Sequence, residues 1–417
     1  MAGEARVVVE GLRSGVPYLE MAREVVLGRD GSMANVRRLL EAVEQDRPPR
    51  VPAYLYRANY GEGKTHLLYS LWGMAEERNW VVSLLTLSRE TPLDRLDYVY
   101  PKLMARTYVP GSRHPGCERI VRQALEARLD LAQARALELS PRVEAVWENL
   151  TNPNLKAEEY ALLVADIGGD FLSINDLKYI HRQNHGQALK IKRSPFKDEV
   201  LYYFHLMDWL IRRSGYPGWL ILFDEVELIG ALGRGGRSRA YANMGRFLSG
   251  FLPHTVTVWA VASNFESDVL MKRHDREECP AWLARHPREA EAAAACGSAI
   301  DAVVAAPLLD PLPAAKMQAL IAQILDRHQE AYEWHSPFDA AALYERVRSL
   351  LPTLDARLRT WVRVTITVLD IWFQYGEDPL ITVEALREVE LDERPEWDGG
   401  SDDEPEAGPV IQRQPLF

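Results

Sequence analysis

Hydrophobic and polar residues form two different patterns along the chain. Residues 33–44 (MANVRRLLEAVE) place apolar side chains three or four positions apart, which is the spacing of one face of a helix. Residues 80–87 (WVVSLLTL) form an uncharged, mostly apolar run, which is typical of a strand buried on both faces of a parallel sheet. The five runs expected to form strands are 52–57, 80–87, 219–230, 255–264 and 300–309.

Helical patterns fill the segments between these runs, so we expect an α/β fold with a parallel sheet flanked by helices. Residues 197–215 predict a long amphipathic helix that ends at Gly215, because glycine readily adopts the conformation that ends helices. The expected domains are an N-terminal helical segment packing on the core (1–45), an α/β core (46–310) with a helical insertion (about 110–195), a helical lid (311–387) and a disordered acidic tail (388–417).

The net charge of −11 is concentrated near the C-terminus. Residues 388–406 carry ten acids and one arginine, a composition that predicts disorder. The rest of the chain is close to neutral, so its total charge neither indicates nor excludes nucleic-acid binding. Three widely spaced cysteines argue against a disulfide framework or a zinc site. Together with the lack of a signal-peptide pattern or a membrane-length apolar run, they favour a cytoplasmic protein without a membrane partner.

Residues 58–68 (ANYGEGKTHLL) follow the first expected strand and open a helical pattern. They match the phosphate-binding loop G-x-x-x-x-G-K-[ST], except that Ala58 stands at the first glycine. Lys64 would supply a cation for the β- and γ-phosphates, and Thr65 a hydroxyl for Mg²⁺. The alternative is a glycine-containing surface turn. Alanine fits the loop entrance only if its φ angle is negative.

A second candidate site follows the apolar run WLILF, where Asp224 and Glu225 stand at the end of the expected strand. We expect Asp224 to help Thr65 hold Mg²⁺ and Glu225 to polarise the attacking water. The alternative is that the two acids cap a helix. The next strand ends in Ser263 and Asn264, and we favour Asn264 as the residue that orients the water. The phosphate loop and the acidic pair are expected at the tips of adjacent parallel strands.

The order of these elements resembles that of AAA+ ATPases, in particular the branch that contains the origin-recognition proteins. More narrowly, residues 57–68 (RANYGEGKTHLL) and 215–229 (GYPGWLILFDEVELI) resemble the ATP-binding proteins of BREX-type phage-defence loci. Glu227, two residues beyond the acidic pair, is part of that resemblance. Residues 240–248 (AYANMGRFL) and 279–286 (CPAWLARH) are also similar to that family.

The resemblance implies ATP and Mg²⁺ as cofactors. It also implies that an arginine beyond the Asn264 strand completes the site of a neighbouring subunit in a homo-oligomer. Arg285 is the first choice, with Arg273 and Arg288 as alternatives. For each of them, an ordinary solvated arginine is the competing interpretation.

A lid arginine that senses the nucleotide is implied as well. Arg359 is our choice for it, with Arg357 and Arg363 as alternatives in the same segment. The residues expected to bind the nucleotide are Asn59, Tyr60, Gly61, Glu62, Gly63, Lys64, Thr65, His66 and Arg359.

The expected function is ATP hydrolysis that drives a conformational change or assembly on DNA or on a partner helicase or nuclease. The alternative is a nucleotide-gated scaffold or adaptor that hydrolyses ATP slowly. The most basic stretch, residues 181–193 (HRQNHGQALKIKR), fits either a contact with phosphate backbones or an ordinary exposed helix end.

Overall fold

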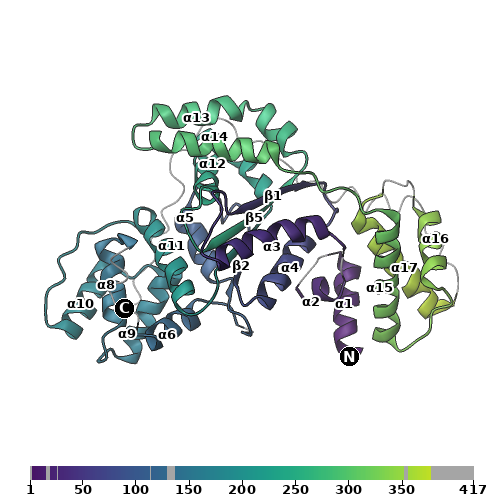
Figure 1. Ribbon diagram of the computed structural model, residues 1–417, viewed down its shortest axis with the longest axis horizontal. Helices are drawn as coiled ribbons and strands as arrows, with labels where there is room; N and C mark the ends of the chain where they lie inside the picture. Colours follow the sequence, from purple (N-terminus) through teal and green to yellow (C-terminus); the bar gives the residue numbers. More distant parts are fainter. Residues whose placement is uncertain are drawn as a thin grey trace.

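A central sheet lies between two groups of helices in the computed structural model, and the N-terminal and lid helices lie side by side at one end (Figure 1). The acidic tail expected over residues 388–417 lies outside the described residues. The structure describes residues 2–15, 19–25, 27–112, 114–128, 137–351 and 356–376.

Five strands form one sheet in the order β1-β5-β4-β2-β3. The first four in this order run parallel, and β3 pairs antiparallel with β2. The predicted α/β class with a mostly parallel sheet is therefore confirmed, as are four of the five predicted strands. The strands are β1 (Ala53–Ala58), β2 (Val81–Thr86), β3 (Thr107–Tyr108), β4 (Trp219–Asp224) and β5 (Thr255–Ala262).

The fifth expected strand, 300–309, is mostly helical. The helix α14 (Ala293–Ala305) runs through it, since its alanine-rich sequence has high helix propensity. Beyond the helix, the Arg57 amide donates to the Pro307 carbonyl (2.8 Å) and the Leu309 amide donates to the Arg57 carbonyl (2.7 Å). The predicted strand is thus reduced to a single parallel bridge beside β1.

The strand order also corrects the expectation that the phosphate-loop strand and the acidic strand are adjacent. β5 lies between β1 and β4 and pairs with both. Parallel strands present their carboxyl ends at one edge of a sheet, so the loop after β1 and the acids after β4 still meet there.

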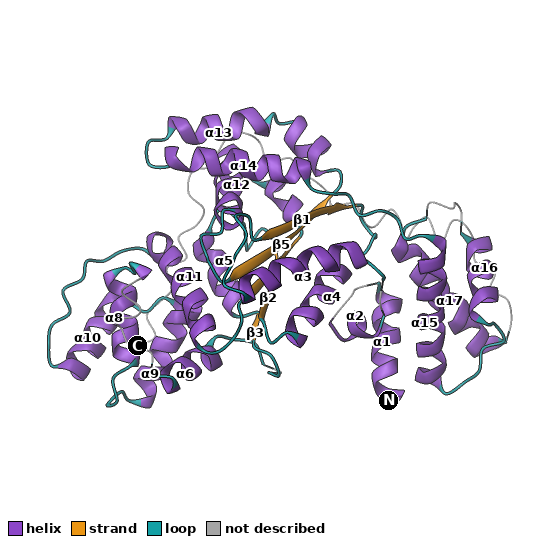
Figure 2. Ribbon diagram, viewed as in Figure 1, coloured by secondary structure: helices purple, strands orange, loops and turns teal. Residues whose placement is uncertain are grey.

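Helices cover both faces of the sheet, as Figure 2 shows. Successive side chains of a strand point to opposite faces. Leu220 and Leu222 pack with α3 and α4 on one face, whereas Ile221 and Phe223 pack with α5, α11, α12 and α14 on the other. These covering helices are α3 (Asp30–Glu44), α4 (Lys64–Glu77), α5 (Leu96–Met104), α11 (Phe196–Arg213) and α12 (Arg234–Leu248).

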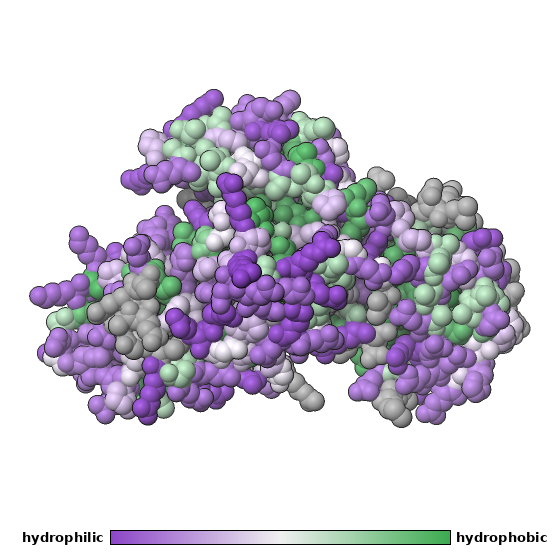
Figure 3. All heavy atoms as spheres, viewed as in Figure 1, coloured by the Kyte–Doolittle hydropathy of each residue, from purple (hydrophilic) through white to green (hydrophobic). Residues whose placement is uncertain are grey.

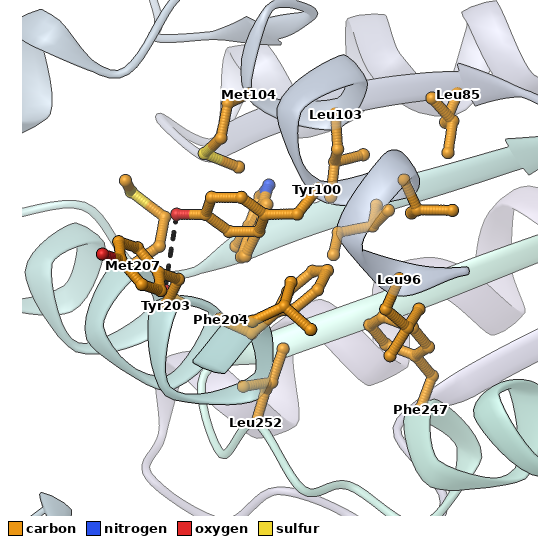
Figure 4. Close-up of a cluster of buried hydrophobic side chains, with 14 of the residues drawn as sticks. Leu85, Leu96, Tyr100, Leu103, Met104, Tyr203, Phe204, Met207, Phe247 and Leu252 are labelled. Carbon is orange, nitrogen blue, oxygen red and sulfur yellow. Dashed lines mark hydrogen bonds between the residues drawn. The ribbon is translucent and has the colours of Figure 1, made fainter. Parts of the chain in front are cut away.

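The insertion forms a helical lobe beyond α5 and α11 with a mostly hydrophilic surface on the face in Figure 3. Tyr100 of α5 packs edge-on against Phe204 of α11, and its hydroxyl donates to the Tyr203 carbonyl at 3.4 Å (Figure 4). Within the lobe, Arg142 lies 2.5 Å from the buried carboxylate of Asp166. The lobe's helices are α6 (Glu118–Glu126), α8 (Pro141–Leu150), α9 (Ala157–Ala165) and α10 (Ile174–His185).

The C-terminal helical region has a hydrophobic core of its own. The helix α1 belongs to it, because α1 packs against α15 and α17 rather than against the sheet. The helix α2, which packs on α4, and the helix α3 join the N-terminal segment to the core. The helices involved are α1 (Ala2–Ser14), α2 (Leu19–Glu24), α15 (Ala314–Tyr332), α16 (Ala340–Leu350) and α17 (Leu358–Tyr375).

The remaining helix, α13 (Asp275–Arg285), packs with α12 and α14 on the sheet face opposite α3 and α4. Among the helices that the structure describes, none is long and apolar enough to cross a membrane.

Candidate nucleotide-binding site

The loop after β1 has the backbone conformation that its glycines permit. Gly61 (φ 77°) and Gly63 (φ 85°) are left-handed, and a Cβ at Gly63 would lie 2.9 Å from the Leu27 side chain. Ala58 is the last residue of β1, pairs with Ala262 and does not have a positive φ. Alanine therefore fits at the loop entrance without backbone strain.

Two residues at the start of α4 contact the acidic segment after β4. The Thr65 hydroxyl donates to Asp224 Oδ2 at 2.7 Å. Lys64 Nζ lies 2.5 Å from Glu227 Oε1, and both side chains are buried. These contacts join residues about 160 positions apart, so the loop and the acidic segment form one site.

The pairing of Thr65 with Asp224 fits a Mg²⁺ site. A hydroxyl and a carboxylate are the hard oxygen donors that Mg²⁺ binds. Burial raises the pKa of the Asp224 carboxyl, so a bound cation would offset the cost of a buried negative charge.

Glu225 has two features that are common at functional sites. Its backbone is left-handed (φ 56°, ψ 39°), a conformation that costs free energy for a residue with a Cβ. Burial, followed by the neighbouring Glu227 carboxylate, raises the pKa of Glu225 to about 7. The side chain also lines the cleft described below. A carboxyl with a pKa near neutrality can exchange a proton during a reaction.

At the tip of β5, the side chains do not converge on Glu225. The Asn264 amide donates to Asp268 Oδ2 at 2.8 Å, within the turn that follows the strand. The Ser263 hydroxyl donates to the Asn59 side-chain oxygen and so links the ends of β5 and β1. The residue that reaches the tip of β5 from the acidic segment is Glu227, whose Oε2 accepts from the Ala262 amide at 2.9 Å.

The helical region closes over the phosphate loop to form a cleft. The Arg359 amide at the start of α17 donates to the Gly61 carbonyl at 3.0 Å, and Arg29 Nη2 donates to the Glu62 carbonyl at 3.0 Å. The cleft is open to solvent and holds about 720 Å³ of empty space, its open mouth included. Its polar lining comes from Tyr60, Lys64, Thr65, His66, Glu225 and Arg359.

The rest of the cleft lining is apolar and comes from segments with no recognisable motif. These residues are spaced like ordinary helix-core positions, so no sequence signal distinguishes them from the core of the lid. The apolar lining consists of Leu12, Met21, Val25, Leu27, Leu320, Leu358 and Val362.

Three of the remaining loop residues have distinct surroundings. The Tyr60 ring lies 4.4 Å from Lys64 Nζ, close enough for a cation–π contact. Burial raises the pKa of Glu62 and lowers that of His66 to about 4. His66 is therefore neutral at physiological pH.

The candidate trans-acting arginines lie outside this cleft. Arg285 is exposed at the end of α13, and neither Arg273 nor Arg288 lines the cleft. A role in a neighbouring subunit's site stays a prediction, as do the assigned roles of Asn264 and Arg359.

Comparison with known proteins agrees with this geometry. No curated protein matches the chain. Residues 2–159, which contain α1, the phosphate loop and the first strands, match the family model described as BREX system ATP-binding protein BrxC/D. Over these residues, which make up less than half of the chain, the protein is similar to a P-loop ATP-binding family of BREX systems.

Proposed function

We propose that this protein hydrolyses ATP and uses the cycle to drive a conformational change or assembly in phage defence. The observation that carries the proposal is the convergence of Lys64, Thr65, Asp224 and Glu225, from two distant segments, at one cleft. An ammonium, a hydroxyl and two carboxylates are the groups that phosphoryl transfer to water requires.

Each residue has a task that follows from its position. The loop amides and Lys64 bind the phosphates, because the amino end of α4 and its lysine face the cleft. Thr65 and Asp224 would hold Mg²⁺, which when bound neutralises phosphate charge. Glu225 accepts a proton from the attacking water, a role that suits a carboxyl with a pKa of about 7. The apolar lining excludes water from the base and ribose.

The test is steady-state ATP turnover by the full chain, with and without DNA. We expect turnover by the wild type that collapses in Glu225→Gln and in Lys64→Ala. If the wild type binds ATP but hardly turns it over, or if Glu225→Gln locks an oligomer, the nucleotide-gated adaptor is the better description. Oligomer mass with and without ATP tests the proposed homo-oligomer, and Arg285→Ala tests the trans-acting arginine.

DNA is the partner that the charge distribution favours over a helicase or nuclease. Residues 178–197 carry six cations and no acid. Among the described residues, none of these six side chains forms an ion pair or a hydrogen bond, and five are exposed. Unpaired cations on one continuous segment suit a phosphate backbone. The six are Lys178, Arg182, Lys190, Lys192, Arg193 and Lys197.

Neutralising three of these cations tests the DNA contact. For the triple variant Lys190→Gln, Lys192→Gln and Arg193→Gln, we expect duplex affinity to fall at least roughly tenfold at low salt, with a shallower salt dependence. ATP affinity should be unchanged. A wild type that does not bind duplex DNA, or a triple variant that binds it equally well, would leave a protein partner as the alternative.

A further inference from the structure

Glu227 is a buried residue to which the proposed hydrolysis assigns no direct contact with the nucleotide. It lies in the turn of 3₁₀ helix Val226–Ala231 after β4, and its side chain is fully buried. One carboxylate oxygen lies 2.5 Å from Lys64 Nζ, and the other accepts from the Ala262 amide at 2.9 Å. The lysine that defines the phosphate loop thus already has a counter-ion.

We propose that Glu227 is the resting counter-ion of Lys64, and that the phosphates of a nucleoside triphosphate must displace it to bind. This inference rests on the proposed function, because it assumes that the cleft is the ATP site. Glu227 is a positioning residue, since it acts through Lys64 and does not line the cleft itself.

The two partners differ in their freedom to move. Glu227 is anchored by its second hydrogen bond, to the backbone at the end of β5, so its carboxylate is fixed to the sheet. Lys64 lies at the cleft wall on a flexible four-carbon stem, with the Tyr60 ring beside its ammonium. Nucleotide binding can therefore turn the lysine towards the phosphates while the glutamate stays in place.

The physical consequence is a trade between stability and affinity. A lysine that is 6% exposed without a partner would be costly, so the ion pair supports the nucleotide-free protein. Nucleotide binding must then break that ion pair. The apparent affinity for the nucleotide is therefore the intrinsic affinity multiplied by the fraction of molecules in which Lys64 is free of Glu227. The ion pair therefore raises the nucleotide concentration needed to occupy the site, and a neutral residue at position 227 would lower that concentration.

The variant Glu227→Gln tests this, because glutamine keeps the shape and can still accept from the Ala262 amide but carries no charge. We expect ATP affinity, measured by calorimetry on the full chain, to rise about tenfold. KM should fall by a similar factor. In a Lys64→Ala background, the same substitution should have no effect on affinity, which would show that it acts through the lysine.

A matched control separates this effect from general loss of a buried ion pair. Asp166 is as buried as Glu227 and lies 2.5 Å from Arg142, in the insertion and outside the cleft lining. Asp166→Asn should destabilise the fold without changing ATP affinity. If Glu227→Gln does not fold, Glu227→Asp keeps the charge on a shorter side chain and should raise affinity by a smaller factor.

Unchanged or weaker ATP binding by a folded Glu227→Gln variant would overturn the proposal and leave the ATP site intact. Absence of ATP binding by the wild type is a different result, since it would overturn the proposed function itself.

Discussion

The two walls of the cleft differ in chemistry and in origin. The charged wall comes from the phosphate loop and the end of β4, where Lys64, Thr65 and Glu225 have specific partners. The apolar wall comes from α1, α2, the segment after α2, α15 and α17, whose apolar side chains belong to the core of the C-terminal helical region. In the proposed function, the charged wall binds the phosphates and the apolar wall binds the base.

This difference predicts how substitutions in each wall affect catalysis and binding. Charged groups in a buried site act through directed contacts, so single substitutions there should abolish a step. Apolar groups act roughly in proportion to the area they cover, so single substitutions there should weaken binding gradually. Substitutions in the two walls test that division.

Removing the carboxylate that faces the cleft should have the largest effect. Glu225→Gln is expected to lower kcat by roughly a thousandfold, because it removes the proton acceptor. ATP affinity should change little. Rapid-quench measurement of a single turnover checks the chemical step directly. Equal loss of binding and of turnover would mean that Glu225 holds the nucleotide rather than the water.

Removing the loop lysine should weaken binding of phosphates by whichever ligand carries them. Lys64→Ala is expected to lower the affinity for ATP and for inorganic tripolyphosphate by about a hundredfold each, because charge-assisted contacts are lost. Calorimetry with both ligands makes the comparison. A loss confined to ATP would contradict the assignment of this wall to the phosphates.

The buried His66 side chain in the charged wall should make the free energy of unfolding depend on pH. Burial, with a smaller contribution from Arg29 and against the opposing hydrogen bond to the Val25 backbone, lowers the pKa of His66 from 6.5 to about 4, so the unfolded chain binds more protons between these values. The stability from keeping His66 neutral is therefore complete above pH 6.5 and is lost as pH falls towards 4. We expect this contribution to amount to about 2 kcal/mol between pH 7 and pH 4.5.

Urea unfolding across that range, on wild type and His66→Gln, measures this contribution. The variant should lose less stability on acidification than the wild type does. Parallel curves for the two proteins would show that His66 does not titrate between the folded and unfolded states.

The apolar wall should give the smallest effect and the most selective one. Val362→Ala removes two methyl groups from the cleft lining and is expected to weaken ATP binding about fivefold. Tripolyphosphate affinity should not change. Val364→Ala, on the same helix but in the core of the lid, is the matched control and should cost stability without changing either affinity. An equal loss for both ligands would remove the distinction between the walls.

The charged wall could be predicted from the sequence, because its residues occur at fixed spacings imposed by the ligand. A glycine-bearing loop ending in Lys64 and Thr65, and a carboxylate pair after an apolar strand, are informative without coordinates. The apolar wall could not be predicted, since Leu12 and Val362 have the same helical spacing as any core residue. The pairing of Lys64 with Glu227 could not be predicted either, because Glu227 lies beyond the carboxylate pair at the strand end and matches no motif for a lysine partner.

The alternation of strands and helices, the phosphate loop and the acidic pair can be predicted from the sequence alone. Local spacing and residue chemistry specify each of them. Only the tertiary structure decided that β5 separates β1 from β4, that residues 300–305 are helical, and that α1 joins the lid. These outcomes depend on which distant surfaces bury one another, and local patterns do not encode such a choice. The same reason applies to the ion pair beneath the cleft, where the fold brings Glu227 to Lys64.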